Sequence, residues 1–167
     1  NLRGLYTINH SKDTWKLKVN KQTSLLLDTQ FTTIIFSPAF NFLEIGQGQT
    51  YEIKRAGYYL EFFKSQKKIE TVVFDLSKNK DQEWNAKQFS FLVKIMHDLL
   101  KQNEKVKIYI FHNDLKKIIN SEKVEDTSFK IHLIYLFNFY FNYKEEFDQR
   151  IIFPGIGEKE MYNFRMN

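Results

Sequence analysis

The chain has 167 residues with a formal net charge of +5, and 43% of them are hydrophobic, including 17 phenylalanines. This length suits one large domain or two small ones, and the apolar share excludes a disordered protein. The absence of cysteine excludes disulfides, thiolate metal sites and thiol catalysis, while the mild positive charge permits contact with phosphate groups.

The first half of the chain is predicted to form strands. Trp15, Leu17 and Val19 alternate with Lys16 and Lys18, which is the period of a half-buried strand. Five or six strands in about 75 residues, with no helix between them, predict a small barrel or sandwich. The predicted strands cover residues 5–8, 15–19, 31–36, 51–55, 58–63 and 69–76.

The second half of the chain changes from a period of two to the period of a helix near Asp81. Residues 84–103 carry an amphipathic stripe, and two more helices are predicted after Asn113 or Asp114 and after Ser128. Strands are predicted at 106–111, 150–153 and 161–164, the last two flanking a glycine-containing turn.

This order of elements is that of a winged helix. The predicted organisation is an OB-like barrel over 1–80, a linking amphipathic helix over 81–103 and a winged-helix-like domain over 104–167. The alternative is a single α/β or α+β domain, in which residues 71–76 and 106–111 are parallel strands flanking the helix.

The histidines and glycines give no catalytic signature. His10, His97, His112 and His132 lack the spacing of a helical metal pair, so solvated or structurally hydrogen-bonded histidines are predicted. The two Gly-x-Gly turns lack the helix and lysine of a phosphate-binding loop. We therefore predict neither a metal ion nor a cofactor.

The sharpest catalytic candidate is a set of charged residues on predicted strands. Asp28, followed by Glu52 and Lys54 on one strand face, has the arrangement of a metal-dependent nuclease. In such enzymes the carboxylates hold Mg²⁺ and the lysine stabilises developing charge. A solvated strand face of a lysine-rich chain has the same Glu-x-Lys pattern, so the nuclease is the alternative to a noncatalytic function.

Basic and aromatic residues also gather on the predicted strands and their hairpin loop. Bases stack on aromatic rings while lysine and arginine contact the phosphates, so this composition indicates a single-stranded nucleic-acid surface. A sheet core surrounded by solubilising lysines is the competing interpretation. The predicted nucleic-acid-binding residues are Lys16, Lys18, Lys54, Arg55, Tyr58, Lys64, Lys67 and Lys68.

The segment 43–78 resembles the fourth and fifth strands of an OB-fold, through Leu43, Ile45, Gly46, Tyr51 and Ile53. With the predicted winged helix behind it, the chain is similar to the family of the replication protein A middle subunit and the Stn subunit of the telomeric CST complex.

The resemblance implies a noncatalytic, nuclear or otherwise intracellular subunit of a complex on single-stranded DNA or RNA, possessing weak strand affinity of its own. It also implies two protein partners, a small OB-fold protein and a larger subunit. The helix after the barrel would contact them through Phe89, Leu92, Val93, Met96 and Leu100. The alternative is that this stripe packs on the barrel within the same chain. No apolar run reaches the ~18–20 residues of a membrane-spanning helix.

Overall fold

The structure, a computed structural model, describes residues 6–8, 14–18, 30–37, 63–77, 86–120 and 129–166. At residues 6–8, 14–18, 36–37, 86–88 and 91 it describes the backbone alone. The predicted strand at 51–55 and most of the one at 58–63 lie outside these ranges; residues 63–65, which are described, are helical.

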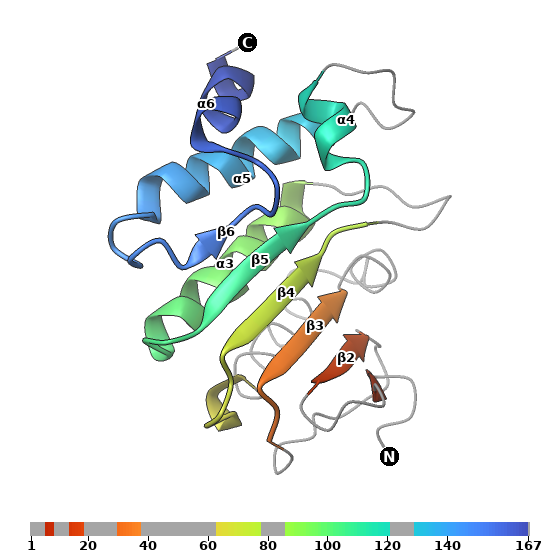
Figure 1. The fold of residues 1–167 in the computed structure, drawn as a ribbon, viewed down its shortest axis with the longest axis vertical. Helices are drawn as coiled ribbons and strands as arrows, with labels where there is room; N and C mark the ends of the chain where they lie inside the picture. The colour runs from red at the N-terminus through yellow and green to blue at the C-terminus, as the bar shows by residue number, and fades with distance from the viewer. Residues whose placement is uncertain are drawn as a thin grey trace.

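Among the described residues, six strands form one sheet in which spatial order follows chain order (Figure 1). The first two strands pair antiparallel, and every later neighbour pair is parallel. The strands are β1 (Tyr6–Ile8), β2 (Thr14–Lys18), β3 (Thr33–Ser37), β4 (Thr71–Asp75), β5 (Lys107–Phe111) and β6 (Ile151–Ile152).

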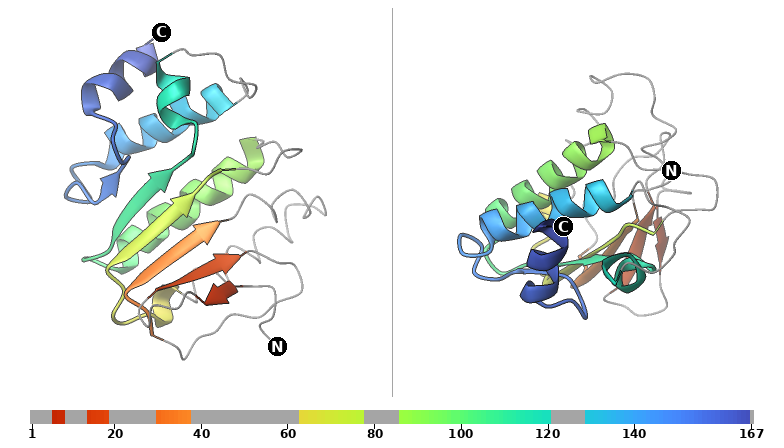
Figure 2. Two further views of the ribbon diagram at one scale, coloured as in Figure 1. Left: turned by 45° about the vertical axis from the view of Figure 1, so that its right-hand side comes forward. Right: turned by 90° about the horizontal axis from the view of Figure 1, so that it is seen from above.

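Helices α3 to α6 accompany the sheet. Figure 2 shows α3 and α5 side by side on one face of it. Parallel strands added successively in one direction through right-handed crossovers place their connecting helices on the same face. The helices are α3 (Ala86–Gln102), α4 (Leu115–Ile119), α5 (Phe129–Tyr143) and α6 (Glu158–Met166).

The predicted barrel and winged helix are therefore wrong, and the chain forms a single α/β domain. β4 pairs in parallel with β5 in the register Thr71 to Lys107, so one sheet joins residues that the prediction assigned to separate domains over 1–80 and 104–167. α3 connects these two strands, as in the α/β alternative. A barrel would instead need a sheet that closes on itself.

The predicted strand at 161–164 is also wrong, because these residues belong to α6. Gly155, with a φ of +76°, makes the turn before this helix. The Gly157 N–H donates a hydrogen bond to Glu160 Oε1 at 3.2 Å, the return bond of a capping box. Glu158 and Glu160 in the first turn also suit the positive end of the helix dipole.

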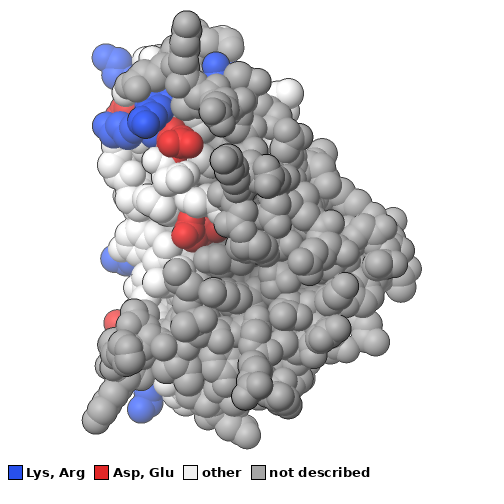
Figure 3. All heavy atoms as spheres, turned by 90° about the vertical axis from the view of Figure 1, so that its right-hand side faces the viewer, with Lys and Arg blue, Asp and Glu red and all other residues white. Residues whose placement is uncertain are grey.

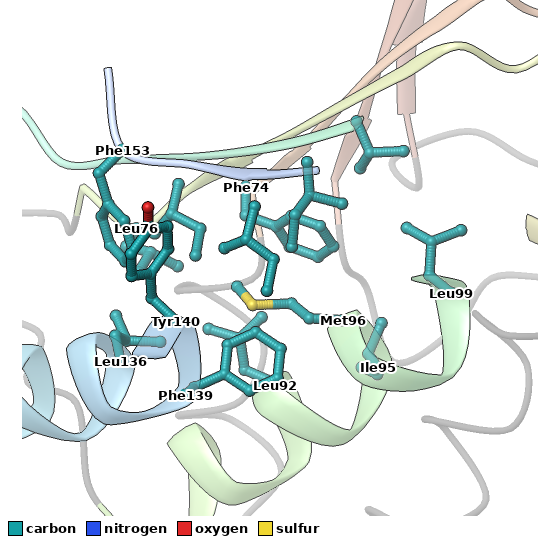
Figure 4. Packing of buried hydrophobic residues seen from close by; sticks show 14 of the residues in the cluster. Phe74, Leu76, Leu92, Ile95, Met96, Leu99, Leu136, Phe139, Tyr140 and Phe153 are labelled. Atoms are coloured by element: carbon teal, nitrogen blue, oxygen red, sulfur yellow. The ribbon is translucent and has the colours of Figure 1, made fainter. Parts of the chain in front are cut away.

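The core lies between the sheet and the pair α3 and α5. Alternate residues of the central strands, such as Phe74 and Ile108, are fully buried. Figure 4 shows Phe74 pointing toward Leu92 and Met96 of α3, with Phe139 of α5 beside them. Each fully buried side chain of this size contributes roughly 1.5–3 kcal/mol, so this one layer of contacts holds both halves of the chain together.

A polar contact fastens α6 to α5 at the edge of the core. The Tyr140 hydroxyl donates a hydrogen bond to Glu158 Oε1 at 2.6 Å, and Lys144 Nζ lies 3.2 Å from the same oxygen. Desolvation and this hydrogen bond raise the pKa of Tyr140 to about 12. The hydrogen bonds from Tyr140 and Lys144 lower the pKa of Glu158.

The contact predicts an acid-dependent loss of stability. The pKa of Glu158 is lower in the folded chain than in the unfolded chain. The ionised carboxylate therefore adds to the free energy of unfolding above the unfolded pKa, and this stabilisation is lost as the pH falls through the folded pKa. Half of the Glu158 side chain is exposed, so we expect only about 0.5–1 kcal/mol. Urea unfolding of the parent and of Glu158→Gln at neutral and acidic pH measures the difference in their free energies of unfolding. The two should differ less in acid, whereas Glu145→Gln, at an exposed glutamate, should match the parent at both pH values.

Candidate functional site

The carboxyl ends of the parallel strands are the usual place for a ligand in an open α/β sheet. Such ligands sit where the strand order reverses, and the order from β2 to β6 has no reversal. On the side shown in Figure 3, basic side chains gather at the top, at the level of α4, next to acidic groups. Lys116 of α4 has its Nζ 4.0 Å from Glu160 Oε2.

Hydrogen bonds hold the loops together at this carboxyl end. The Asn113 N–H donates to Ser77 Oγ at 3.0 Å, and the Ser77 N–H donates to Asp75 Oδ1 at 3.0 Å. The Leu76 N–H donates to the Phe111 carbonyl oxygen at 2.7 Å. The polar groups of these turns thus bind the loop that follows β4 to the loop that follows β5.

His112 is part of this structural network. Its Nδ1 accepts a hydrogen bond from the Asp114 N–H at 3.0 Å. The ring is buried and stacks on Phe129 with centroids 4.3 Å apart. His132 stacks in the same way on Phe89 at 4.4 Å. Both imidazole rings therefore pack against aromatic rings of α3 and α5.

Metal chemistry has no support from the described part of the chain. Among those residues, no three histidine or acidic side chains lie together as ligands for an ion. The predicted nuclease residues Asp28, Glu52 and Lys54 fall outside the described ranges, so the nuclease stays a prediction.

A hollow of about 370 Å³ lies at the opposite end of the sheet, where β4 and β5 begin. One wall is the segment that precedes β4, and the other is the end of α3 with the turn that leads into β5. Its lining is mostly polar and includes three lysines and one glutamate. The lining residues are Phe63, Lys64, Gln66, Lys67, Gln102, Asn103, Glu104 and Lys105.

Two glutamines fix the first wall. Gln30 Nε2 donates to the Ser65 carbonyl oxygen at 3.0 Å, and Gln30 Oε1 accepts from the Lys67 N–H at 2.7 Å. In return, Gln66 Oε1 accepts from the Phe31 N–H at 2.9 Å, and Gln66 is buried. The segment that carries Lys64 and Lys67 is therefore fastened to the residues before β3.

Arg150 fixes the second wall. Its guanidinium donates hydrogen bonds to the carbonyl oxygens of Leu100, Asn103 and Val106 at 2.7–2.9 Å. Its Nε donates to the Phe147 carbonyl oxygen at 3.0 Å. Burial lowers the pKa of Arg150, yet a guanidinium keeps its proton in proteins. Arg150 thus places a positive charge against the negative end of the α3 dipole.

The charge on the hollow is positive. Lys64, Lys67 and Lys105 are exposed, and none of them forms an ion pair with another described residue. Lys94 and Lys101, by contrast, pair with Asp98 and Glu146 at 2.9 and 2.7 Å. Three ammonium groups against the one carboxylate of Glu104 leave a surplus of two positive charges in the lining.

The predicted nucleic-acid-binding residues are only partly brought together. Lys64 and Lys67 line the hollow, and Lys68 is exposed next to them. Lys16 and Lys18 belong to β2, of which only the backbone is described, and Lys54, Arg55 and Tyr58 lie outside the described residues. Lys105 carries no signal in the sequence, and it joins the hollow because a helical crossover returns the chain to the starting end of the sheet.

The predicted partner-binding stripe of α3 faces the core of this chain. Phe89, Leu92, Met96 and Leu100 are at most 1% exposed, and Val93 packs against the same cluster. Burial in the core already accounts for the stripe. Contact between these side chains and a partner stays a prediction.

No described helix combines the length and apolar character needed to cross a membrane. Comparisons of the chain with protein-family models, with curated proteins and with solved structures found no match.

Proposed function

We propose that the chain is a noncatalytic α/β binding domain that contacts the phosphates of a single-stranded nucleic acid through its lysine-lined hollow. The observation that carries this proposal is the set of three lysines without ion-pair partners among the described residues, on two hydrogen-bonded walls of one cavity. Lys68 and Lys107 are exposed at the same end of the sheet and extend the positive surface.

The proposal keeps the predicted ligand class and gives it a different location. Phosphate contacts with lysine supply sequence-independent affinity that depends on salt. With a net charge of only +5, the affinity of the chain alone should be weak, and partners in a complex would strengthen it. The replication and telomere assignments depended on the barrel and lose that support.

The test is a fluorescence titration of a labelled single-stranded oligonucleotide at several salt concentrations. Each lost phosphate contact should reduce the log–log salt slope by roughly 0.7. We therefore expect the combined variant Lys64→Ala, Lys67→Ala and Lys105→Ala to reduce the slope by about 2.

The matched control removes the same total charge elsewhere. Lys94→Ala, Lys116→Ala and Lys117→Ala together alter three exposed lysines on α3 and α4. The salt slope of this control variant should be close to that of the parent. Absence of binding at low salt, or equal losses in the two variants, would contradict the proposed site.

A further inference from the structure

The hollow has the dimensions of a small-ligand site as well as the charge of a phosphate surface. Its volume of about 370 Å³ is in the range of small-molecule pockets, roughly 300–1,000 Å³. Lysines stand on both of its walls, Lys64 and Lys67 on one and Lys105 on the other. A group that enters the hollow is therefore exposed to cations from two sides.

Three lysines around one cavity match a particular form of phosphate. A phosphodiester within a strand carries one negative charge. A terminal phosphate carries about −1.5 to −2 at neutral pH and offers three strong acceptor oxygens. Lysine acts toward such a group as a point charge with three donors. The surplus of two positive charges in the lining thus balances a terminal phosphate more completely than an internal one.

The hollow has two features unfavourable to an anion, the carboxylate of Glu104 and the negative end of α3, and the second is compensated. The lining includes Gln102, the last residue of α3, and the carbonyl oxygens at this end of the helix would repel an anion. Arg150 donates to the Leu100 and Asn103 carbonyl oxygens of this end at 2.9 and 2.7 Å. The guanidinium therefore offsets the negative end of the helix and leaves the lysines free to determine the local charge.

We infer that the hollow prefers a phosphomonoester of nucleotide size, namely the phosphorylated end of a strand or a free nucleoside monophosphate. This inference rests on the proposed function and narrows it from phosphates along a strand to a phosphate at its end. Lys64, Lys67 and Lys105 are the residues that hold the group.

The test compares two labelled oligonucleotides of one sequence, identical except that one carries a terminal phosphate and the other a hydroxyl. At neutral pH and low salt, the full chain should bind the phosphorylated strand more tightly by on the order of tenfold. An unlabelled nucleoside monophosphate should compete with it, which tests the free-nucleotide source directly. The preference should decline below about pH 6, where the phosphate loses its second charge.

Substitutions of the lining lysines test whether the preference for the phosphorylated strand arises in the hollow. Lys64→Ala and Lys105→Ala, one from each wall, should each reduce it, and the triple variant should abolish it. Lys94→Ala, Lys116→Ala and Lys117→Ala together should keep it. The altered lysines are exposed, and a urea titration of each variant checks that its folding is unchanged.

The outcomes separate the inference from the proposed function. Equal affinity for the two strands, with the salt slope still reduced in the lysine variant, would overturn the inference and keep the proposed function. No binding of either strand would overturn both. A preference that survives in the triple variant would show that the end is recognised elsewhere, which also overturns the inference.

Discussion

Phe74→Ala should lower the free energy of unfolding by about 3–5 kcal/mol. Phe74 is fully buried on β4 and points toward both α3 and α5. Its removal leaves a cavity where the sheet meets two helices, and surrounding groups relax only partly into such a space. Urea unfolding followed by circular dichroism measures the loss.

The control is the same substitution on the neighbouring strand. Phe111 ends β5 and is 43% exposed, so Phe111→Ala should lower the free energy of unfolding by about 1 kcal/mol or less. Similar losses for the two variants would show that the two faces of the sheet are not buried as described. Two separate unfolding transitions in the parent would contradict a single domain.

Arg150→Lys should lower the free energy of unfolding by about 2–4 kcal/mol, although it keeps the charge. The guanidinium donates to four carbonyl oxygens from α3, the turn before β5 and the turn before β6. A lysine has one ammonium group and cannot reproduce this planar set of donors. Several partly buried carbonyl groups would then lose their partners.

Arg165→Lys provides the comparison for an arginine whose contacts are fewer. Arg165 makes one hydrogen bond of 3.3 Å to Asn138 and lies 4.4 Å from the centroid of the Phe141 ring. Its replacement should lower the free energy of unfolding by no more than about 1 kcal/mol. If Arg150→Lys has an equally small effect, the guanidinium does not hold the end of α3 in the way inferred.

Most individual elements could be predicted from the sequence because their signals are local. The stripe from Phe89 to Leu100 predicts α3, and the predicted strands at 69–76 and 106–111 correspond to β4 and β5. Val72 and Phe74 are buried between half-buried neighbours, which is the period of two of a strand.

The assembly of these elements could not be predicted from the same signals. An alternating strand pairs equally well in an antiparallel barrel or a parallel sheet, and the period of the pattern does not identify the neighbour. The length of the connection is the better guide. β4 and β5 are separated by α3, and a helical crossover of this kind joins parallel strands. The resemblance to an OB-fold outweighed this signal and led to the wrong fold.

The candidate site was predicted in part. Lys64 and Lys67 stood out in the sequence because they form a dense basic run. Lys105 gave no such signal, because its proximity to them depends on the parallel pairing of β4 with β5. Arg150 was likewise not recognised, because its four carbonyl partners come from segments that are distant in the sequence.

The most direct test of phosphate binding at the hollow is a map of the backbone amide chemical shifts during a titration with a single-stranded oligonucleotide. The proposed site predicts that the largest changes fall at residues 64–68 and 102–107, on the two walls of the hollow. Changes concentrated at residues 75–77 and 112–114, at the opposite end of the sheet, or no changes at low salt, would contradict it.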